Sequence, residues 1–591
     1  MHIYRIDNTY CFRMENNSNE SGKPRETVTL ILKEERFEVD KQKLIDKSQY
    51  FAALLSTNFL EYGQTEHVIN YDISSIVLQG FIDWIHHDKI VFTSATSYDF
   101  DDMLDYFLNL LELSVLFGAD ELTDDITNKL EKHYKSPKYA IKIWLLAQKL
   151  NINVLRDLSL ALCLDRFDQL PVNSIYELSS ENFLKLIGNI NVRATEIYLF
   201  DIINQWKNHH RDFTIPSDIV LKKKAILHGI ISCEHNNREQ YIYCWDGNDF
   251  FELTSFEYPP DIIEHCSSTG KPLEGMQITA RRYDLYLCGG EYGIGSGTFN
   301  KNVWRYSLIS KKWILETVMP VGRRDMITVF LKDKLLLVGG IRQYELPSET
   351  IEIYDIYTGI WTEGAKVPTI FSYSRTDNYY RMVHKHISFN FSKRMGMLRP
   401  KSVTISVHFT SVTEHFIFSD TLIIYQAPSF YKYFPDKDVW EVKSYRNLYE
   451  ELTFINTPIL ALETKSCYID VDQDEMVLKI VTETCNVEGC NNIIKTYPGY
   501  SKSILEEKKN MDGSFFLTPF FREPFHGERP AGLLYADHII RNKTLHLHSI
   551  SIQDPKKFRS LYFTSKNSIK GFFNLNLLHP AHLHTTNLDH I

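Results

Sequence analysis

A recurring combination of paired glycines and regularly spaced aromatic residues constrains the second half of this chain more than any other feature. Two apolar runs end in glycine pairs 50 residues apart, at Gly289-Gly290 and Gly339-Gly340. Each pair is followed by a tyrosine with a tryptophan seven residues further on, and the same spacing returns once more: Tyr306–Trp313, Tyr354–Trp361 and Tyr433–Trp440. Self-similarity at a period of about 50 residues is typical of repeat architectures.

The repeat has a direct physical interpretation. A small antiparallel sheet cannot bury both of its faces alone, so neighbouring sheets must stack. Glycine pairs suit the end of an inner strand, where backbones approach closely, and the rings supply apolar surface between stacked sheets. Weaker echoes raise the number of repeats to six: Tyr243–Phe250, Val471–Leu478 and Ser551–Phe558. We therefore expect residues 240–591 to form an all-β, six-bladed propeller with degenerate carboxy-terminal blades.

The first 235 residues carry other patterns and predict a multidomain chain. Residues 1–25 are polar and predict a flexible lead. Within 26–135, apolar residues alternate over 28–32 as in a strand and recur at helical spacing over 104–111. This predicts an α/β domain.

Residues 136–235 predict an all-helical domain. Pro137 suits the first turn of a helix. Leu199, Ile202, Ile203 and Trp206 follow the i, i+3, i+4, i+7 spacing of an apolar helix face. Short polar connections favour consecutive helices stacked in antiparallel pairs.

Charge and composition restrict the class of partner. The formal net charge of −10 argues against nucleic acid, because phosphate binding requires a basic face. No apolar run reaches the roughly 18 to 20 residues of a membrane span, and no signal-peptide pattern is present. The odd count of nine scattered cysteines suits a reducing compartment. We expect a cytoplasmic protein, with a cytoskeletal or nuclear location as alternatives, and no nucleic-acid or membrane partner.

No catalytic constellation is recognisable in the sequence. Walker loops, Gly-x-Ser-x-Gly elbows and His-Glu-x-x-His helices are missing. Cys485 and Cys490 lack the second ligand pair that a zinc site needs, and the histidine-rich residues 579–590 are expected to be a frayed tail rather than a metal site. We therefore expect no enzyme activity, no catalytic or metal-binding residues and no cofactor.

Four segments resemble the kelch-like family, whose members combine a BTB domain, a BACK domain and a kelch propeller. Phe37–Phe51 is similar to the BTB signature and keeps its Phe, Leu, Ser, Tyr and Phe in register. The other three are Leu110–Leu122, similar to the helix that ends the BTB core, Asn191–His210, similar to a BACK segment, and the glycine–tyrosine–tryptophan repeat with Pro320 and Arg323. The resemblance implies a BTB domain at 26–135, a BACK domain at 136–235 and a kelch propeller at 240–591.

The resemblance also implies a partner, because BTB domains of this family commonly bind cullin-3 through a hydrophobic residue, any residue and a glutamate. The matching positions here are Phe59 and Glu61, which follow the helix expected to end near Asn58. An exposed Phe59 would insert into a pocket and Glu61 would orient the approach. The alternative is that Phe59 packs inward and Glu61 is only solvated.

A second candidate site lies on the propeller. Family propellers hold protein substrates on loops that connect strands, and arginines occur at several such positions: Arg282, Arg323, Arg324 and Arg342. Arginine pairs with carboxylates through two hydrogen bonds, so a rim of arginines would suit an acidic motif in the partner. The alternative is that these arginines stay solvated or pair with nearby acids such as Asp325 and Glu345.

Two functions compete on the sequence alone. The first is a substrate-recognition adaptor of a cullin-3 ubiquitin ligase, with cullin-3 and an unidentified protein substrate as partners and a BTB homodimer as a further possibility. The second is a cytoskeletal, actin-associated or scaffolding kelch protein that binds no cullin. The propeller loops that would choose the substrate vary freely, so the sequence does not identify it.

Overall fold

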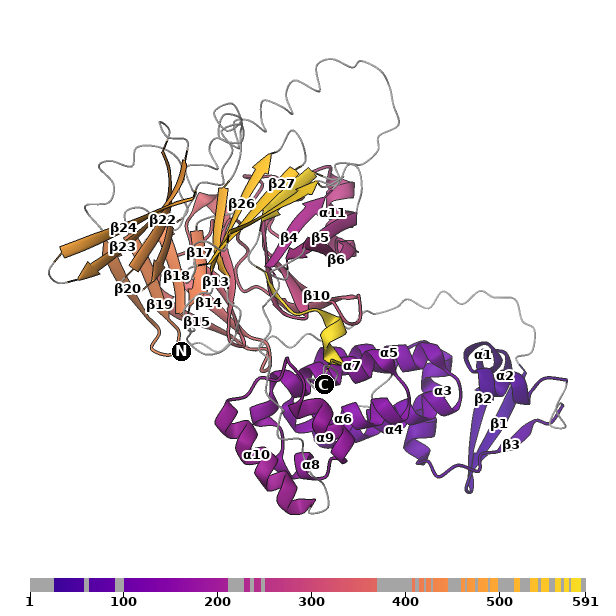
Figure 1. The fold of residues 1–591 in the computed structure, drawn as a ribbon. Coiled ribbons are helices and arrows are strands. Elements are labelled where there is room, and N and C mark those ends of the chain that lie inside the picture. Colours follow the sequence, from indigo (N-terminus) through magenta and orange to yellow (C-terminus); the bar gives the residue numbers. More distant parts are fainter. Residues whose placement is uncertain are drawn as a thin grey trace. The chain divides into compact units, whose positions relative to one another are not determined.

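The computed structural model describes residues 26–57, 63–90, 100–210, 228–233, 239–245 and 250–368, the further strands given below, and residues 575–585. The chain divides into two compact units (Figure 1), an amino-terminal unit of residues 6–219 and a carboxy-terminal unit that comprises chiefly residues 220–591.

The amino-terminal unit begins with a small sheet. Strands β1 (Thr27–Leu32), β2 (Glu35–Asp40) and β3 (Glu66–Val68) lie in the order β2-β1-β3, with β1 and β2 antiparallel and β1 and β3 parallel. Val28, Leu30 and Leu32 are buried, while the residues between them are partly exposed. The period-two pattern in the sequence therefore corresponds to one buried face of this sheet.

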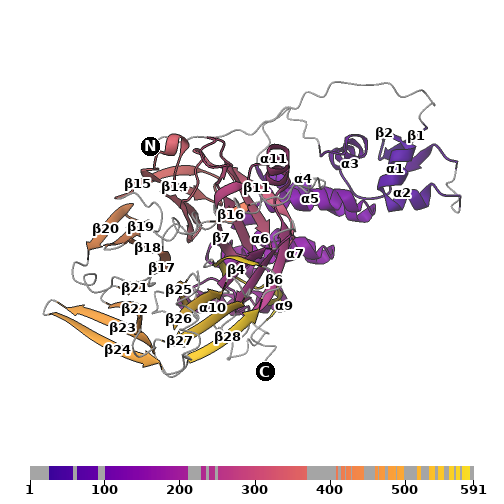
Figure 2. The same cartoon turned by 90° about the horizontal axis from the view of Figure 1, so that it is seen from above.

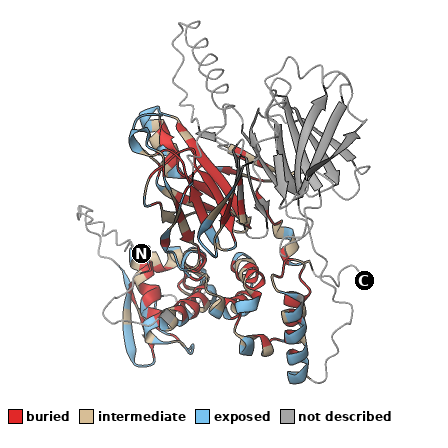
Figure 3. Ribbon diagram, turned by 90° about the vertical axis from the view of Figure 1, so that its left-hand side faces the viewer, coloured by how far each residue is buried: buried red, intermediate tan, exposed pale blue. Residues whose placement is uncertain are grey.

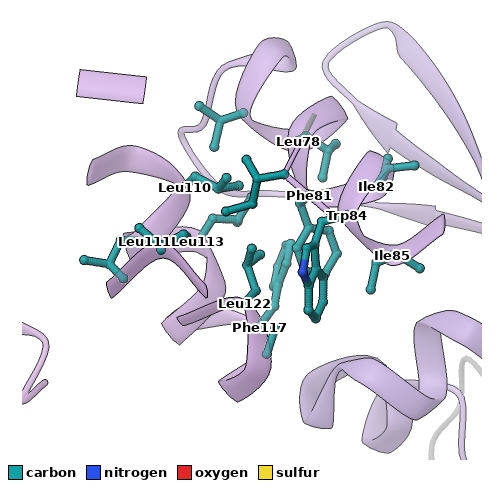
Figure 4. Packing of buried hydrophobic residues seen from close by; sticks show 14 of the residues in the cluster. Leu78, Phe81, Ile82, Trp84, Ile85, Leu110, Leu111, Leu113, Phe117 and Leu122 are labelled. Carbon is teal, nitrogen blue, oxygen red and sulfur yellow. The ribbon is translucent and has the colours of Figure 1, made fainter. Parts of the chain in front are cut away.

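Helices complete this unit and bury the other residues of its core. They are α1 (Lys41–Lys47), α2 (Gln49–Leu54), α3 (Ser75–His87), α4 (Phe100–Leu116), α5 (Asp120–His133), α6 (Pro137–Lys149), α7 (Asn153–Asp165), the short 3-10 turn η1 (Phe167–Gln169), α8 (Val172–Tyr176), α9 (Ser180–Ile187) and α10 (Glu196–His209). Figure 4 shows Phe81 and Trp84 of α3 packed with Phe117 and with leucines of α4 and α5.

The residues that made Phe37–Phe51 recognisable have structural roles. Ser48 accepts a hydrogen bond from the Phe51 amide at the start of α2 (3.3 Å) and donates one to the Phe117 carbonyl (2.6 Å). Tyr50 and Phe51 both pack on the Phe117 ring, with centroid distances of 5.4 and 5.0 Å. Asp40, where the family usually has histidine, accepts a hydrogen bond from the Lys43 amide and caps α1. The residues of this signature therefore pack the core of the domain and cap its helices.

The hydrophobic core runs without a break across residue 135. Ile143 and Ala147 of α6 and Leu155 of α7 belong to the same buried cluster as the sheet and α3 to α5. Exposed ion pairs add contacts between α4 and α6: Lys138–Asp101, Lys142–Asp105 and Lys149–Glu112. Exposed pairs contribute little stability, so apolar packing is the main link between the segments expected to be BTB and BACK.

Further along, α8 to α10 pack around Trp206. Its side chain is fully buried and stacks on Phe183 of α9 at a centroid distance of 4.4 Å. Its indole nitrogen donates a hydrogen bond to the Leu178 carbonyl (3.3 Å). The apolar spacing over 199–206 thus marks the buried face of α10.

The described strands of the carboxy-terminal unit form six separate sheets (Figure 2). In spatial order they are β29 (Ser568–Phe572), β4 (His228–Cys233), β5 (Glu239–Trp245) and β6 (Phe250–Glu257); β16 (Val407–Phe409), β7 (Leu273–Arg282), β8 (Asp284–Cys288), β10 (Asn302–Ser307) and β11 (Trp313–Val318), with β9 (Glu291–Tyr292) and β30 (Asn576–Leu577) also paired to β7; β12 (Ile327–Leu331), β13 (Lys334–Val338), β14 (Thr350–Asp355) and β15 (Trp361–Lys366); β17 (Glu414–Phe418), β18 (Thr421–Gln426), β19 (Ser429–Phe434) and β20 (Val439–Ser444); β21 (Ile459–Leu462), β22 (Lys465–Asp472), β23 (Val477–Asn486) and β24 (Gly489–Tyr497); and β25 (Phe515–Phe520), β26 (Gly532–Ile539), β27 (Thr544–Ser551) and β28 (Phe558–Thr564). One longer helix, α11 (Pro260–Thr269), connects β6 to β7.

Burial falls from one edge of a sheet to the other. Every residue of β12 is buried, and so are four of the five residues of β13, whereas β15 is mostly exposed. The neighbouring sheet shows the same gradient from β7 to β11. Figure 3 shows that buried residues make up much of the described strands of this unit. A strand that is buried on both faces requires packing partners on both sides, so β7 and β12 lie deep within the unit.

The tyrosine–tryptophan spacing marks the outer hairpin of a sheet. Tyr306 lies opposite Trp313, Tyr354 opposite Trp361 and Tyr433 opposite Trp440, with ring centroids 5.0 to 5.1 Å apart. Each of these hairpins also makes a hydrogen bond to the sheet that precedes it in the sequence. The Trp313 indole donates to the Glu257 carbonyl (2.7 Å), the Trp361 indole donates to the Thr317 hydroxyl (2.9 Å), and Tyr433 donates to Asp438, which accepts from the Ala365 amide (2.7 Å).

The weaker echoes are uneven in quality. All six spaced pairs fall in different sheets, and five of them span the outer hairpin. Val471–Leu478 instead spans the middle hairpin, between β22 and β23. Tyr243 lies opposite Glu252, and Phe250 lies opposite Trp245 instead. The number of spaced pairs thus equals the number of sheets, but a pair does not always mark the outer hairpin of its sheet.

The end of the chain is built into this unit. Strand β29 pairs with β4, so strands from the two ends of the unit share one sheet. Leu577 is fully buried and Leu583 nearly so, and Pro580–Leu583 form a 3-10 turn, η3. The expectation of a frayed tail is therefore wrong for residues 579–585, because they include the turn η3 and the buried Leu583.

Buried thiols allow the stability of each unit to be measured separately. Burial raises the pKa of the Cys163 thiol in the amino-terminal unit and of the Cys288 thiol in the carboxy-terminal unit. Thiolates are the reactive form, so both should resist alkylation until their unit unfolds. Alkylation in increasing urea therefore gives one unfolding midpoint per unit.

Trp361 provides a test of the aromatic packing between sheets. Trp361→Ala should destabilise the carboxy-terminal unit by about 3–5 kcal/mol, because a buried ring is lost. Trp361→Phe should cost only about 1 kcal/mol, the value of the lost hydrogen bond to Thr317. The Cys288 midpoint should fall in that order while the Cys163 midpoint stays constant; equal effects of both substitutions would contradict the packing described here.

Candidate partner-binding surfaces

The predicted cullin-binding residues Phe59 and Glu61 lie outside the residues that the structure describes. The chain on either side of them is fixed. Helix α2 is held by Ser48 and Phe51, and after residue 62 the chain returns to the sheet as β3. Apolar side chains are exposed on the described part of the same domain, at Val68 (61%) and Ile76 (65%). The binding role of Phe59 and Glu61 stays a prediction.

In the carboxy-terminal unit, a second candidate site centres on the side chain of Arg324. This guanidinium, 1% exposed, donates to Glu291 (2.9 Å), to Asp325 (2.5 Å) and to both carboxylate oxygens of Glu345 (2.8 and 2.6 Å). Glu291 and Asp325 are themselves nearly fully buried, whereas the Glu345 side chain is 58% exposed. A buried arginine with several carboxylate partners is a structural ion-pair network rather than a charge offered to solvent.

Arg323 is equally enclosed. Its side chain is fully buried, pairs with Glu352 and donates to the Gly339 carbonyl (3.1 Å). Burial raises the pKa of the Glu352 carboxyl, and the charge of Arg323 opposes that rise. This pair links the segment before β12 to β14 within the same sheet.

The glycine pairs belong to this arrangement. A Cβ atom on Gly289 would lie 2.6 Å from the Arg323 carbonyl oxygen, and one on Gly340 would lie 2.8 Å from the Arg324 carbonyl oxygen. Both glycines have positive φ angles, 70° and 87°. The Gly290 amide donates to the Arg323 carbonyl (3.0 Å), and Arg324 exchanges two backbone hydrogen bonds with Ile341. The glycines are thus required for the Arg323-Arg324 backbone to pass between two sheets.

The four predicted rim arginines do not form one cluster. Arg323, Arg324 and Arg342 lie at the end of the sheets where β12 begins and β13 ends. Arg282 ends β7, whereas the Asp325 amide bonds to Gly275 near the start of β7. At about 3.3 Å per strand residue, Arg282 is on the order of 20 Å away from them along the strand.

The expectation of a solvent-facing arginine rim is therefore corrected. Arg323 and Arg324 are buried because their backbone is hydrogen-bonded to Gly290 on one side and to Ile341 on the other, which places their side chains in the interior. Arg282 is 8% exposed, and the half-buried Arg342 donates to the Pro347 carbonyl (3.2 Å). Pairing of Arg324 with Asp325 and Glu345 matches the alternative weighed from the sequence.

Apolar side chains are exposed at the same end of these sheets. Tyr344 is 83% exposed, Leu346 54% and Ile294 43%. They occupy the loops that follow the two glycine pairs, and sequence reasoning missed them because it looked there for charge. The signal was present as a tyrosine and a leucine in a short loop between two strand patterns.

Comparison with known proteins identifies the amino-terminal domain. Residues 16–134 match the family model of the BTB/POZ domain. This chain contains a BTB domain. No curated protein matches the sequence. BTB domains are protein-interaction modules, which makes proteins the relevant class of partner for this domain.

The described part of the chain holds neither a cluster of metal ligands nor a membrane-spanning helix. No group of three or more histidine, cysteine, aspartate or glutamate side chains is arranged to hold a metal ion there. None of the helices described above is long and apolar enough to span a bilayer.

Replacing Arg324 distinguishes a structural role from a binding role. Arg324→Ala should destabilise the carboxy-terminal unit by about 3–5 kcal/mol, because Glu291 loses its buried cationic partner. Lys366→Ala, which breaks the exposed pair with Glu349, is the matched control and should cost less than about 1 kcal/mol. The Cys288 alkylation midpoint measures both; an unchanged midpoint for Arg324→Ala would mean that the guanidinium is available to a partner.

Proposed function

We propose that this protein is a substrate-recognition adaptor of a cullin-3 ubiquitin ligase. The BTB domain would bind cullin-3, and the carboxy-terminal unit would bind the protein to be modified. The observation that carries the proposal is the BTB/POZ match at residues 16–134, joined in one chain to a separate β-rich unit. The proposal assigns no catalysis to this chain, because the ligase it joins would supply it.

The proposal includes a closed kelch propeller in the carboxy-terminal unit. Six sheets, each with an outer hairpin, and deeply buried strands β7 and β12 support it. The pairing of β29 with β4 supports closure, because joining both ends of the repeat array in one blade removes a free edge. Loops on one end of such a ring form a concentrated binding surface, as a substrate receptor needs.

A BACK role for α6 to α10 is also part of the proposal. Because α6 and α7 share the core of the BTB domain, they would present a rigid continuation of the cullin-binding surface. A BTB homodimer would give the ligase two substrate-binding units, which raises avidity for a partner with two sites.

The double substitution Phe59→Ala with Glu61→Ala tests the cullin interface. The purified full chain should bind cullin-3 with sub-micromolar affinity, and the double variant should lose at least about 1 kcal/mol, roughly fivefold, because an anchor and its orienting charge are removed. Isothermal titration calorimetry measures both. Ile197→Ala, at a 77% exposed residue of α10, serves as the control and should bind normally.

Each result has a distinct meaning. Normal binding by the double variant removes the motif from the proposal but keeps the adaptor. If the unaltered chain binds no cullin-3 and co-sediments with actin filaments, the adaptor proposal fails and the cytoskeletal scaffold replaces it.

A further inference from the structure

The loop of residues 342–347 holds a tyrosine in an unfavourable backbone conformation. Tyr344 has φ 61° and ψ 28°, and Glu345 follows with φ 58°. Two consecutive non-glycine residues in the left-handed region are rare, and each costs free energy that the surrounding structure must offset. The Tyr344 ring gains no burial in return, because it is 83% exposed.

The loop is held in this conformation from both sides. Arg324 clamps both carboxylate oxygens of Glu345. The Arg342 amide donates to the Leu346 carbonyl, and the Ser348 amide donates to the Gly340 carbonyl, each at 2.8 Å. A loop fixed in this way loses little conformational entropy when it binds a partner.

The exposed apolar residues of two loops adjoin. Gly297 lies close to the Gln343 side chain: a Cβ atom added to this glycine would be 3.5 Å from Nε2 of Gln343. The loop that carries Ile294 therefore lies beside the loop that carries Tyr344 and Leu346. We call Ile294, Gln343, Tyr344 and Leu346 the Tyr344 surface. A rigid aromatic ring flanked by aliphatic side chains is the composition of an interface anchor.

The charges around this surface do not suit an acidic motif. Arg323 and Arg324 are buried against carboxylates, and Arg342 donates to a carbonyl of its own loop. Glu345, 58% exposed, lies beside Tyr344, and the exposed Lys271 lies beside Gly293 in the loop that carries Ile294, so the accessible charges are one carboxylate and one ammonium rather than a group of arginines. A partner would therefore meet a protruding apolar group with a phenol hydroxyl and a carboxylate at its side.

We propose that Tyr344 is the anchor through which this unit binds its protein partner, inserting into an apolar pocket on a folded domain of that partner. This inference rests on the proposed function and specifies its substrate class. A protruding ring requires a concave receptor, so the partner supplies the pocket, in contrast to an extended acidic peptide held by arginines. Binding of this kind depends on buried apolar area and changes little with salt.

The test uses the full chain with the photoreactive amino acid p-benzoylphenylalanine in place of Tyr344, irradiated in extracts of the cells that express it, at low and at high ionic strength. Position 360 carries the same probe as the matched control, because Ile360 is 42% exposed at the β14–β15 hairpin of the same sheet, at the end opposite to Tyr344. Cross-links from position 344 should map to apolar side chains of a folded domain and should form equally in buffer of high ionic strength. Position 360 should give none to that protein.

Three substitutions at Tyr344 quantify the effect on the cross-linked partner. Tyr344→Ala should lower its recovery by at least about tenfold, as for an interface anchor, whereas Tyr344→Phe should retain most of it. Tyr344→Gly should also abolish recovery but should raise the Cys288 alkylation midpoint in urea, because glycine adopts positive φ without strain. A lower midpoint for Tyr344→Gly would show that the ring is structural and would overturn the inference.

The remaining outcomes separate this inference from the proposed function. Cross-links to acidic disordered segments, or recovery lost in salt, would overturn the apolar anchor, and so would a partner that cross-links at position 360 but not at 344. Cullin-3 measured in the same purifications reports the adaptor independently: cullin-3 without a Tyr344-dependent partner contradicts only the anchor, and the absence of cullin-3 contradicts the proposed function.

Discussion

The backbone of Arg323 and Arg324 passes between two glycine pairs, and much of the carboxy-terminal unit depends on that close approach. The Arg323 carbonyl accepts from Gly290, Arg324 pairs with Ile341, and the Asp325 amide donates to Gly275. Three consecutive residues thus bond to both adjacent sheets. A side chain on Gly289 or Gly340 would clash with this segment, so the distance between the two sheets is set by glycine on each side and by backbone hydrogen bonds between them.

The same approach decides where charge is placed. The side chains of Arg323 and Arg324 are buried because their backbone lies between the two sheets. Buried charges require partners of opposite sign, and Glu291, Asp325 and Glu352 provide them. The network reaches the surface through Glu345, whose two carboxylate oxygens accept hydrogen bonds from Arg324 at the edge of the loop. The interaction that joins two sheets therefore also holds Tyr344 outward in a strained conformation. A structural network and a candidate binding residue are connected through one side chain.

The sequence predicted the parts of this structure that depend on periodicity. The alternation over 28–32, the helical spacing over 199–206 and the tyrosine–tryptophan hairpins each correspond to one strand, helix or turn, because a buried face repeats with the period of its element. Predictions about exposure were less successful. Whether Arg324 faces water depends on Glu291 and Glu345, which lie 33 and 21 residues away in sequence, and no local pattern encodes that contact. The burial of Leu577 likewise depends on residues far away in sequence, because it packs in one cluster with Leu285 and Leu287 of β8.

The BTB domain illustrates why recognition and function occupy different residues. Ser48, Tyr50 and Phe51 make the signature visible, and all three contact Phe117 inside the domain. Asp40 departs from the family pattern, yet it caps α1, so this departure preserves the helix and says nothing about cullin. Residues inside a domain serve its packing, whereas a partner contacts the loops that the packed domain holds in place. Phe59 and Glu61 follow such a scaffold helix, α2, and Tyr344 follows a scaffold glycine pair. The proposed binding residues thus lie directly after scaffold elements and are not part of them.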